Sequence, residues 1–178
     1  MSLPKELYCD GGVIWSNPSD YGMTWAYRVM MDDGSTLDGS GLEERDDATN
    51  NQAEMMAMIC GLVRCLTLDP LFSGFVYSDS MITINRMFHG ESLTNLPDEL
   101  AREAVGLRDL IRKNKIRYRH CKGHPTKKEL AAGFSKKGRL VSEHQAWCDG
   151  ECGRLSKEYL ASLAHTGPRI IPSATQPA

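Results

Sequence analysis

The stretch YCDGG, Tyr8 to Gly12, decides the fold of this 178-residue sequence. It lies in the run ELYCDGGVIW, residues 6–15, which predicts a strand with a glycine interruption near its middle. Asp followed by Gly is also a common turn signal, so Asp10 taken alone has two interpretations. Three later carboxylates, Glu54, Asp79 and Asp149, lie in surroundings that can bring them to the same point. We therefore interpret Asp10 as the first ligand of a divalent-metal site.

The elements expected around this strand form an α/β fold. The Asp33-Gly34 pair is a hairpin signal between expected strands at 23–32 and 35–43. Further strands are expected at 71–79 and 115–121, and helices at 52–67, 80–88, 96–113 and 142–165, with a long loop or loop with a helical turn at 122–139. This order predicts a mixed five-stranded sheet, three antiparallel strands followed by parallel strands, with helices on both faces.

Length and composition indicate one globular domain over residues 1–165, followed by a proline-rich disordered tail at 166–178. No apolar run approaches the length of a membrane-spanning helix, and the N-terminus lacks a secretory signal. The six cysteines are therefore expected to be reduced thiols in a cytoplasmic protein.

Charge is divided unevenly along the chain. The net charge is −2, yet residues 1–107 carry 6 Lys and Arg against 17 Asp and Glu, whereas residues 108–139 carry 12 against 2. A concentrated basic segment indicates either a polyanionic partner on one face or a solvated loop, and charge alone favours neither.

Five motifs, in order and sensibly spaced, resemble those of type 1 ribonuclease H from about Leu7 to Leu155. They are YCDGG with the following SNPSDYG and Ala26, then TNNQAEM, VYSDS, KGHP and SEHQAWCDGECGRL. The resemblance implies an RNase H-like fold and an endonuclease that hydrolyses the RNA strand of RNA/DNA hybrids, leaving 3′-hydroxyl and 5′-phosphate ends. It also implies two Mg²⁺ ions, with Mn²⁺ as a possible substitute, because hard cations prefer carboxylate ligands.

The resemblance assigns the metal ligands and a catalytic base. The implied ligands are Asp10, Glu54, Asp79 and Asp149, and His124 is the implied base or proton shuttle. Each residue also has a structural interpretation: a turn at Asp10, a helix cap at Glu54 or Asp79, a surface helix position at Asp149 and an exposed loop at His124. The ordered set of motifs makes the joint structural interpretation improbable.

Substrate contacts follow from the same resemblance. The residues expected to contact the hybrid near the first acid and the helix start are Gly12, Asn17, Thr49, Asn50, Asn51 and Gln52. Gly11 and Gly12 are expected to give the nucleic-acid backbone close access. Met81 stands where the family often has glutamine, which removes a polar contact.

The basic segment departs most from the family, because the region corresponding to its basic helix is here acidic or neutral. We expect that the phosphate backbone of the nucleic acid is bound instead, with release of counterions, by Lys127, Lys128, Lys136, Lys137 and Arg139.

Two alternatives remain open from the sequence. His144, Cys148 and Cys152 share one helix face and resemble soft zinc ligands, although such a stripe is more often packing. The protein is alternatively a nuclease of this fold that cuts double-stranded RNA or structured DNA, or a non-catalytic nucleic-acid-binding module. Whichever function holds, we expect that the protein is a monomer, that it binds nucleic acid and that it does not bind a membrane.

Overall fold

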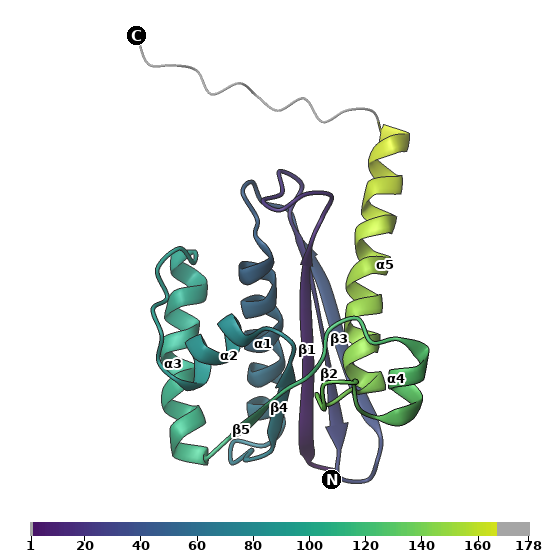
Figure 1. Ribbon diagram of the computed structural model, residues 1–178. Coiled ribbons are helices and arrows are strands. Elements are labelled where there is room, and N and C mark those ends of the chain that lie inside the picture. Colours follow the sequence, from purple (N-terminus) through teal and green to yellow (C-terminus); the bar gives the residue numbers. More distant parts are fainter. Residues whose placement is uncertain (1, 167–178) are drawn as a thin grey trace.

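The computed structural model describes residues 2–166, which form one mixed sheet covered by helices (Figure 1). The strand order is β3-β2-β1-β4-β5, so β1 is central. The strands are β1 Pro4–Val13, β2 Met23–Met31, β3 Thr36–Glu43, β4 Phe75–Ser78 and β5 Arg117–His120. Strands β1 to β3 are antiparallel, and β4 and β5 run parallel to β1. The predicted mixed five-stranded sheet is confirmed.

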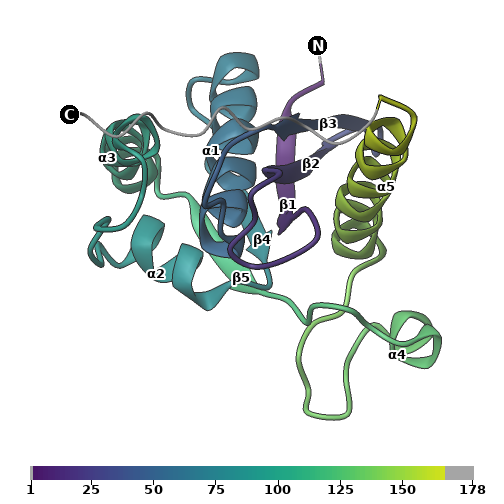
Figure 2. The ribbon, with the colours of Figure 1, turned by 90° about the horizontal axis from the view of Figure 1, so that it is seen from above.

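The helices form layers on both faces of this sheet. They are α1 Asn50–Leu68, α2 Met81–Phe88, α3 Asp98–Asn114, α4 Lys127–Ala132 and α5 Glu143–Thr166. Helices α1, α2 and α3 lie on one side, α5 covers the other, and α4 projects away from the sheet (Figures 1 and 2). The central strand is therefore enclosed by helices on both faces.

Alternation along β1 explains this layering. Leu7 and Cys9 are fully buried in the core that α1, α2 and α3 share with the sheet. Tyr8 points to the opposite face, where it packs with Cys148 and Cys152 of α5. Successive side chains of a strand point to opposite faces, so one short apolar run supplies both cores.

The helix at Lys127–Ala132 lies inside the segment expected to be a long loop or a loop with a helical turn, and it confirms the second alternative. Its N-cap is Thr126, whose hydroxyl oxygen accepts from the backbone N–H of Glu129, while the Glu129 carboxylate accepts from the backbone N–H of Thr126. This reciprocal pair is a capping box, which stabilises a short helix. Gly133 ends it at a φ of 74°.

Most element boundaries differ from the expectation by one or two residues, and one differs by more. Strand β4 begins at Phe75 rather than at residue 71, because Leu71 is exposed and the Phe72 N–H donates to Asp69 in a turn. Helix α5 ends at Thr166. A disordered tail was expected at 166–178, and residues 167–178 lie outside the described residues.

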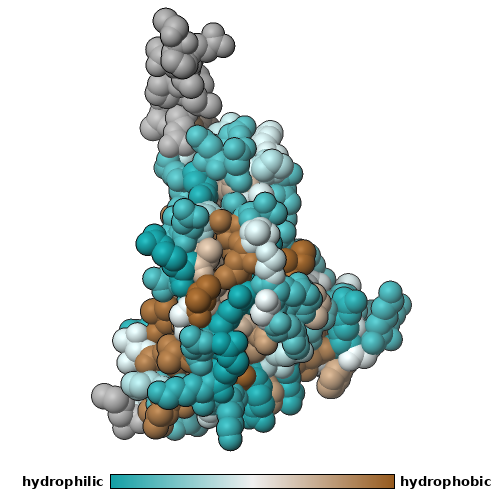
Figure 3. Space-filling view, turned by 90° about the vertical axis from the view of Figure 1, so that its left-hand side faces the viewer, coloured by the Kyte–Doolittle hydropathy of each residue, from teal (hydrophilic) through white to brown (hydrophobic). Residues whose placement is uncertain are grey.

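The face of the molecule seen in Figure 3 is mostly hydrophilic. Apolar residues reach it in places on the side of the molecule that carries α3 (Figure 3). Val63 of α1 and Leu110 of α3 are partly exposed there and line a shallow cleft between the two helices. Within residues 2–166, no helix has the length and apolar character that crossing a membrane requires.

Gly11 sets the distance between β1 and α1. A Cβ atom at this position would lie 2.2 Å from the Ala53 carbonyl carbon and 2.4 Å from the Glu54 backbone nitrogen. The absence of a side chain therefore lets the start of α1 pack against the central strand. Gly11 was also expected to admit a nucleic-acid backbone, and that expectation stays a prediction, because these contacts describe only the side on which a Cβ would lie.

The Gly11→Ala substitution should destabilise the protein, because backbone atoms of α1 cannot move aside independently. We expect the free energy of unfolding to fall by about 2 kcal/mol or more. Gly106→Ala in α3 is the matched control, since a Cβ there meets nothing within 4 Å. It should stabilise the protein by up to about 1 kcal/mol through helix propensity. Urea unfolding of the two variants measures the difference, and equal effects would contradict the packing role of Gly11.

Candidate active site

Three carboxylates from three elements meet beside the central strand. Asp10 lies on β1, Glu54 near the start of α1, and Asp79 directly after the last residue of β4. One oxygen of each lies within 4.8 Å of the others. Among the described residues, this is the single group of three or more potential metal ligands.

Burial and mutual repulsion make this group unfavourable when all three acids are ionised. Burial, followed by the charges of Asp79 and Asp149, raises the pKa of Asp10 to about 8. Burial and the charge of Asp10 raise the pKa of Glu54 well above its usual range, and burial also raises the pKa of Asp79. Glu54 Oε2 and Asp79 Oδ1 are buried without a hydrogen-bond partner. The donors are hard oxygens that need a cation or protons, which fits a divalent metal.

The structural interpretations of these acids are not supported. Asp10 pairs with Ala26 inside the antiparallel ladder, so it is not a turn residue. The N-cap of α2 is Ser80 rather than Asp79. The capping box of α1 consists of Thr49 and Gln52, so Glu54 is not needed to cap that helix.

Asp149 and His124 form a pair outside the group of three. His124 Nδ1 lies 3.0 Å from Asp149 Oδ2 in a hydrogen bond. The His124 side chain is 82% exposed and that of Asp149 is 39% exposed, so the pair is accessible from solvent. The charge of Asp149 raises the pKa of Asp10, so Asp149 interacts electrostatically with the group of three carboxylates. Its role as a metal ligand stays a prediction.

The chain around Asp79 holds two further residues that sequence reasoning missed as site residues. His120 Nε2 is hydrogen-bonded to the Asp79 carbonyl oxygen at 3.0 Å. A Cβ atom at Gly123 would lie 2.0 Å from Asp79 Oδ2, so any side chain there would displace this carboxylate. The glycine in KGHP was a usable signal, because a glycine before a functional histidine often marks a close approach.

Helix α5 is fastened to β1 through the residues that had suggested zinc. The Cys148 and Cys152 thiols donate to the carbonyl oxygens of Tyr8 and Asp10, at 3.6 and 3.4 Å. Burial raises the pKa of both thiols. Among the described residues, neither thiol belongs to a group of three potential metal ligands. Gln145, also missed from the sequence, donates to the Cys9 carbonyl at 2.9 Å. The zinc alternative is therefore not supported, and the stripe serves packing.

The residues expected to contact substrate lie around the start of α1. Asn17 Oδ1 accepts from the backbone N–H of Asn50 at 3.3 Å, which ties the β1–β2 loop to the helix. Thr49 and Gln52 are engaged with each other in the capping box. Gly12 faces Thr24 and Cys152 at ordinary contact distance, and Asn51 is half-buried in α1. Their contacts with nucleic acid stay a prediction.

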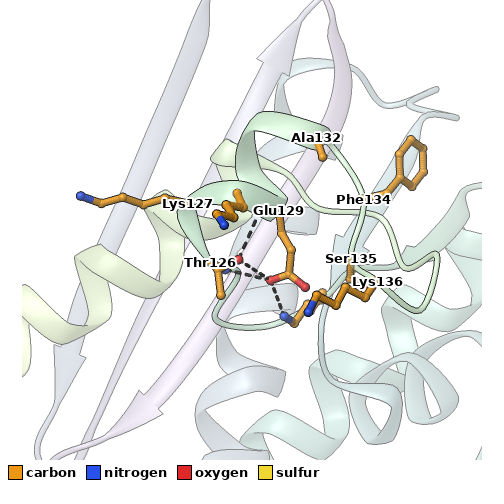
Figure 4. Close-up of a pocket in the computed structure, with 9 residues that line it drawn as sticks. Thr126, Lys127, Glu129, Ala132, Phe134, Ser135 and Lys136 are labelled. Atoms are coloured by element: carbon orange, nitrogen blue, oxygen red, sulfur yellow. Dashed lines mark hydrogen bonds and ion pairs between the residues drawn. The ribbon is translucent and has the colours of Figure 1, made fainter.

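The five basic residues expected to grip the backbone lie on α4 and the hairpin after it. We call Lys127, Lys128, Lys136, Lys137 and Arg139 the basic loop surface; all five are exposed. In the part of the chain that the structure describes, none of them forms an ion pair. Glu129, the acid beside them, is already bound by Lys122 at 2.5 Å and by Thr126 (Figure 4). Their charge therefore remains available to an anion.

Without metal, the stability of the protein should decrease as pH rises. A carboxyl whose pKa is raised on folding keeps a proton that the unfolded chain releases, so the free energy of unfolding falls between about pH 4 and about pH 8. In EDTA, we expect the melting temperature to fall by several degrees across this range, and Mg²⁺ should reduce the fall. Differential scanning calorimetry of the wild type and Asp10→Asn tests this, because the variant should show a shallower decline. An equally steep decline in the variant would contradict the assignment.

The RNase H family model matches residues 4–138, which is more than half of the chain and ends before Asp149. No curated protein sequence matches significantly.

Solved structures share the fold. LC11-RNase H1, isolated from compost by a metagenomic approach, is 18% identical with a TM-score of 0.59, and the alignment covers 89% of this chain and 99% of that one. The N-terminal RNase H domain of Rv2228c from Mycobacterium tuberculosis, solved as a fusion with maltose-binding protein, is 20% identical with a TM-score of 0.58, covering 88% and 96%. LC9-RNase H1, described as a type 1 RNase H with the type 2 active-site motif, is 14% identical with a TM-score of 0.59, covering 96% and 83%. With the family model matching most of its length, this chain belongs to the RNase H family and is a ribonuclease H enzyme.

Proposed function

We propose that this protein hydrolyses the RNA strand of RNA/DNA hybrids with the help of Mg²⁺ ions, giving 3′-hydroxyl and 5′-phosphate ends. The observation that carries the proposal is the group of Asp10, Glu54 and Asp79, whose oxygens lie within 4.8 Å of one another beside the central strand. Such a group destabilises the metal-free protein, so its presence argues for a function that needs bound cations.

The donor set favours Mg²⁺ over softer metals. All three ligands are carboxylates, and two of their oxygens are buried with no protein partner. Asp149, beside the group, supplies a fourth carboxylate. When bound, a pair of divalent ions supplies activation of water and neutralises charge on the attacking and leaving oxygens.

His124 is suited to proton transfer at the edge of this site. Its Nδ1 is oriented by the Asp149 carboxylate, and its exposed ring leaves Nε2 free to exchange protons with solvent or a leaving group. Asp149 therefore has two proposed roles, in fixing His124 and in completing the carboxylate set.

Recognition of the hybrid is assigned to the rim formed by the β1–β2 loop and the start of α1. The Asn17–Asn50 hydrogen bond holds these two segments together close to Glu54. Polar groups there face a wide minor groove, whose 2′-hydroxyls distinguish the RNA strand. We propose that the protein acts as a monomer in the cytoplasm, which agrees with six cysteines that are all free thiols.

Asp10→Asn tests the site. It should lower hybrid cleavage by about 1000-fold or more, because metal binding supplies several kcal/mol of transition-state stabilisation. The variant should be no less stable than the wild type without metal, because one repelling charge is removed. Glu103→Gln makes the same carboxylate-to-amide change at an exposed position of α3 and should leave activity unchanged.

The assay compares labelled RNA/DNA hybrid, double-stranded RNA and double-stranded DNA, each with Mg²⁺ or with EDTA. Cleavage of the hybrid alone, dependent on Mg²⁺, is the expected result. Cleavage confined to another nucleic acid would overturn the substrate, and full activity of Asp10→Asn would remove Asp10 from the mechanism.

Neutralising the basic loop surface by five Lys→Gln and Arg→Gln substitutions should weaken hybrid binding and flatten its dependence on salt. Removing one lysine or arginine from a phosphate makes the slope of log K against log salt concentration shallower by about 0.9. Fluorescence anisotropy over a salt series measures the slope. A control variant that neutralises Lys113, Lys115 and Lys157, which lie outside this surface, should keep most of the slope. An unchanged slope in the five-residue variant would show that these residues do not contact phosphates of the hybrid.

A further inference from the structure

The basic loop surface carries an exposed aromatic side chain that the hybrid-binding role leaves unexplained. Phe134 is 58% exposed and belongs to none of the three hydrophobic clusters of the described residues. It stands at the rim of an open cavity of 760 Å³, and its ring projects away from Glu129 (Figure 4). The remaining walls of the cavity include Lys122, Lys127, Lys128 and Lys136. An aromatic ring among lysines is the combination that binds single-stranded nucleic acid, through stacking and phosphate contacts.

The backbone holds Phe134 in place without using its side chain. Phe134 and Leu140 form an antiparallel bridge, and the Ser135 N–H donates to the Arg139 carbonyl at 2.9 Å to close the hairpin between them. The ring is therefore displayed by a braced hairpin rather than buried by it. The exposed ring is therefore accessible to a partner, and covering it would bury apolar area.

The hairpin is connected directly to the carboxylates. Leu140 bridges Cys121 at the end of β5, and the Lys122 N–H donates to the Leu140 carbonyl at 2.8 Å. The next residue, Gly123, lies against the Asp79 carboxylate. The chain that carries the lysines and Phe134 therefore begins and ends next to the segment that contacts Asp79, where a strand leaving the carboxylates would meet it.

The Phe134 ring distinguishes unpaired bases from bases in a duplex, because it binds a base through its face. Bases inside a duplex are stacked on their neighbours, so their faces are covered, whereas an unpaired base offers its face to an aromatic ring. The lysines alone would bind either form, since they contact phosphates. Phe134 therefore adds affinity only for an unpaired nucleotide.

We propose that Phe134 and the basic loop surface bind a single-stranded extension of the nucleic acid held at the active site, with an unpaired base stacked on the Phe134 ring. The inference rests on the proposed function, because it makes a hybrid with a single-stranded tail the favoured substrate. It adds a second binding site to the one beside the carboxylates.

The test measures binding in EDTA, where no cleavage is needed, by fluorescence anisotropy with the full chain. The probes are a blunt RNA/DNA hybrid and the same hybrid with a single-stranded tail on each strand end in turn. We expect at least one tailed hybrid to bind about fivefold or more tightly than the blunt hybrid. Phe134→Leu should abolish this advantage, because leucine is apolar and has no ring to stack, and should leave binding of the blunt hybrid unchanged. Phe134→Tyr should retain the advantage.

Equal binding of blunt and tailed hybrids by the wild type would overturn the inference, and so would an advantage for tails that survives in Phe134→Leu. A dimer in sedimentation that Phe134→Leu disrupts, without any advantage for tails, would assign the ring to a second copy of the chain and also overturn it. Cleavage with Mg²⁺ is scored separately. It is possible for the two tests to disagree. If no hybrid is cut, but tailed hybrids still bind more tightly than blunt ones and Phe134→Leu removes this difference, the proposed function fails and the single-strand site stands.

Discussion

Repulsion among buried carboxylates is the constraint on which the rest of this structure depends. Asp10, Glu54 and Asp79 come from three elements, yet their oxygens lie within 4.8 Å of one another. Burial and the neighbouring charges raise their pKa values, so ionising the group without a cation costs stability. The surrounding fold has to hold these acids together against that cost. The buried, unpartnered oxygens of Glu54 and Asp79 are consistent with a cation completing the site.

The fold supplies this restraint from both faces of β1. On one face, Gly11 lets α1 pack against the strand, which brings Glu54 next to Asp10. On the other face, Gln145, Cys148 and Cys152 of α5 donate to the carbonyl oxygens of three successive β1 residues. These contacts position Asp149 one residue after Cys148 on the same helix. Residues that carry no chemistry therefore set the geometry of those that do.

Charge is separated in space as well as along the sequence. The carboxylates lie beside the sheet, whereas α4 and its hairpin carry unpaired lysines away from it (Figure 2). The two regions are linked through Cys121, Gly123 and Leu140, an arrangement that the proposed function uses to hold a nucleic acid near the carboxylates. This separation keeps the basic groups away from the carboxylates, and it leaves the Phe134 ring exposed beside the lysines.

The sequence by itself determined the order of the elements, the mixed sheet and the identity of the acids, because alternation, helix composition and turn signals are local properties. The RNase H motifs add order and spacing to these signals. Tertiary structure alone decided how close the acids lie: Asp10, Glu54 and Asp79 meet, while Asp149 stands beside them with His124. It also changed the meaning of Gly11, which serves the packing of α1, and of Cys148 and Cys152, which bind β1 rather than zinc. Distances between elements and the burial of a side chain depend on contacts between residues far apart in the chain, which local pattern does not encode.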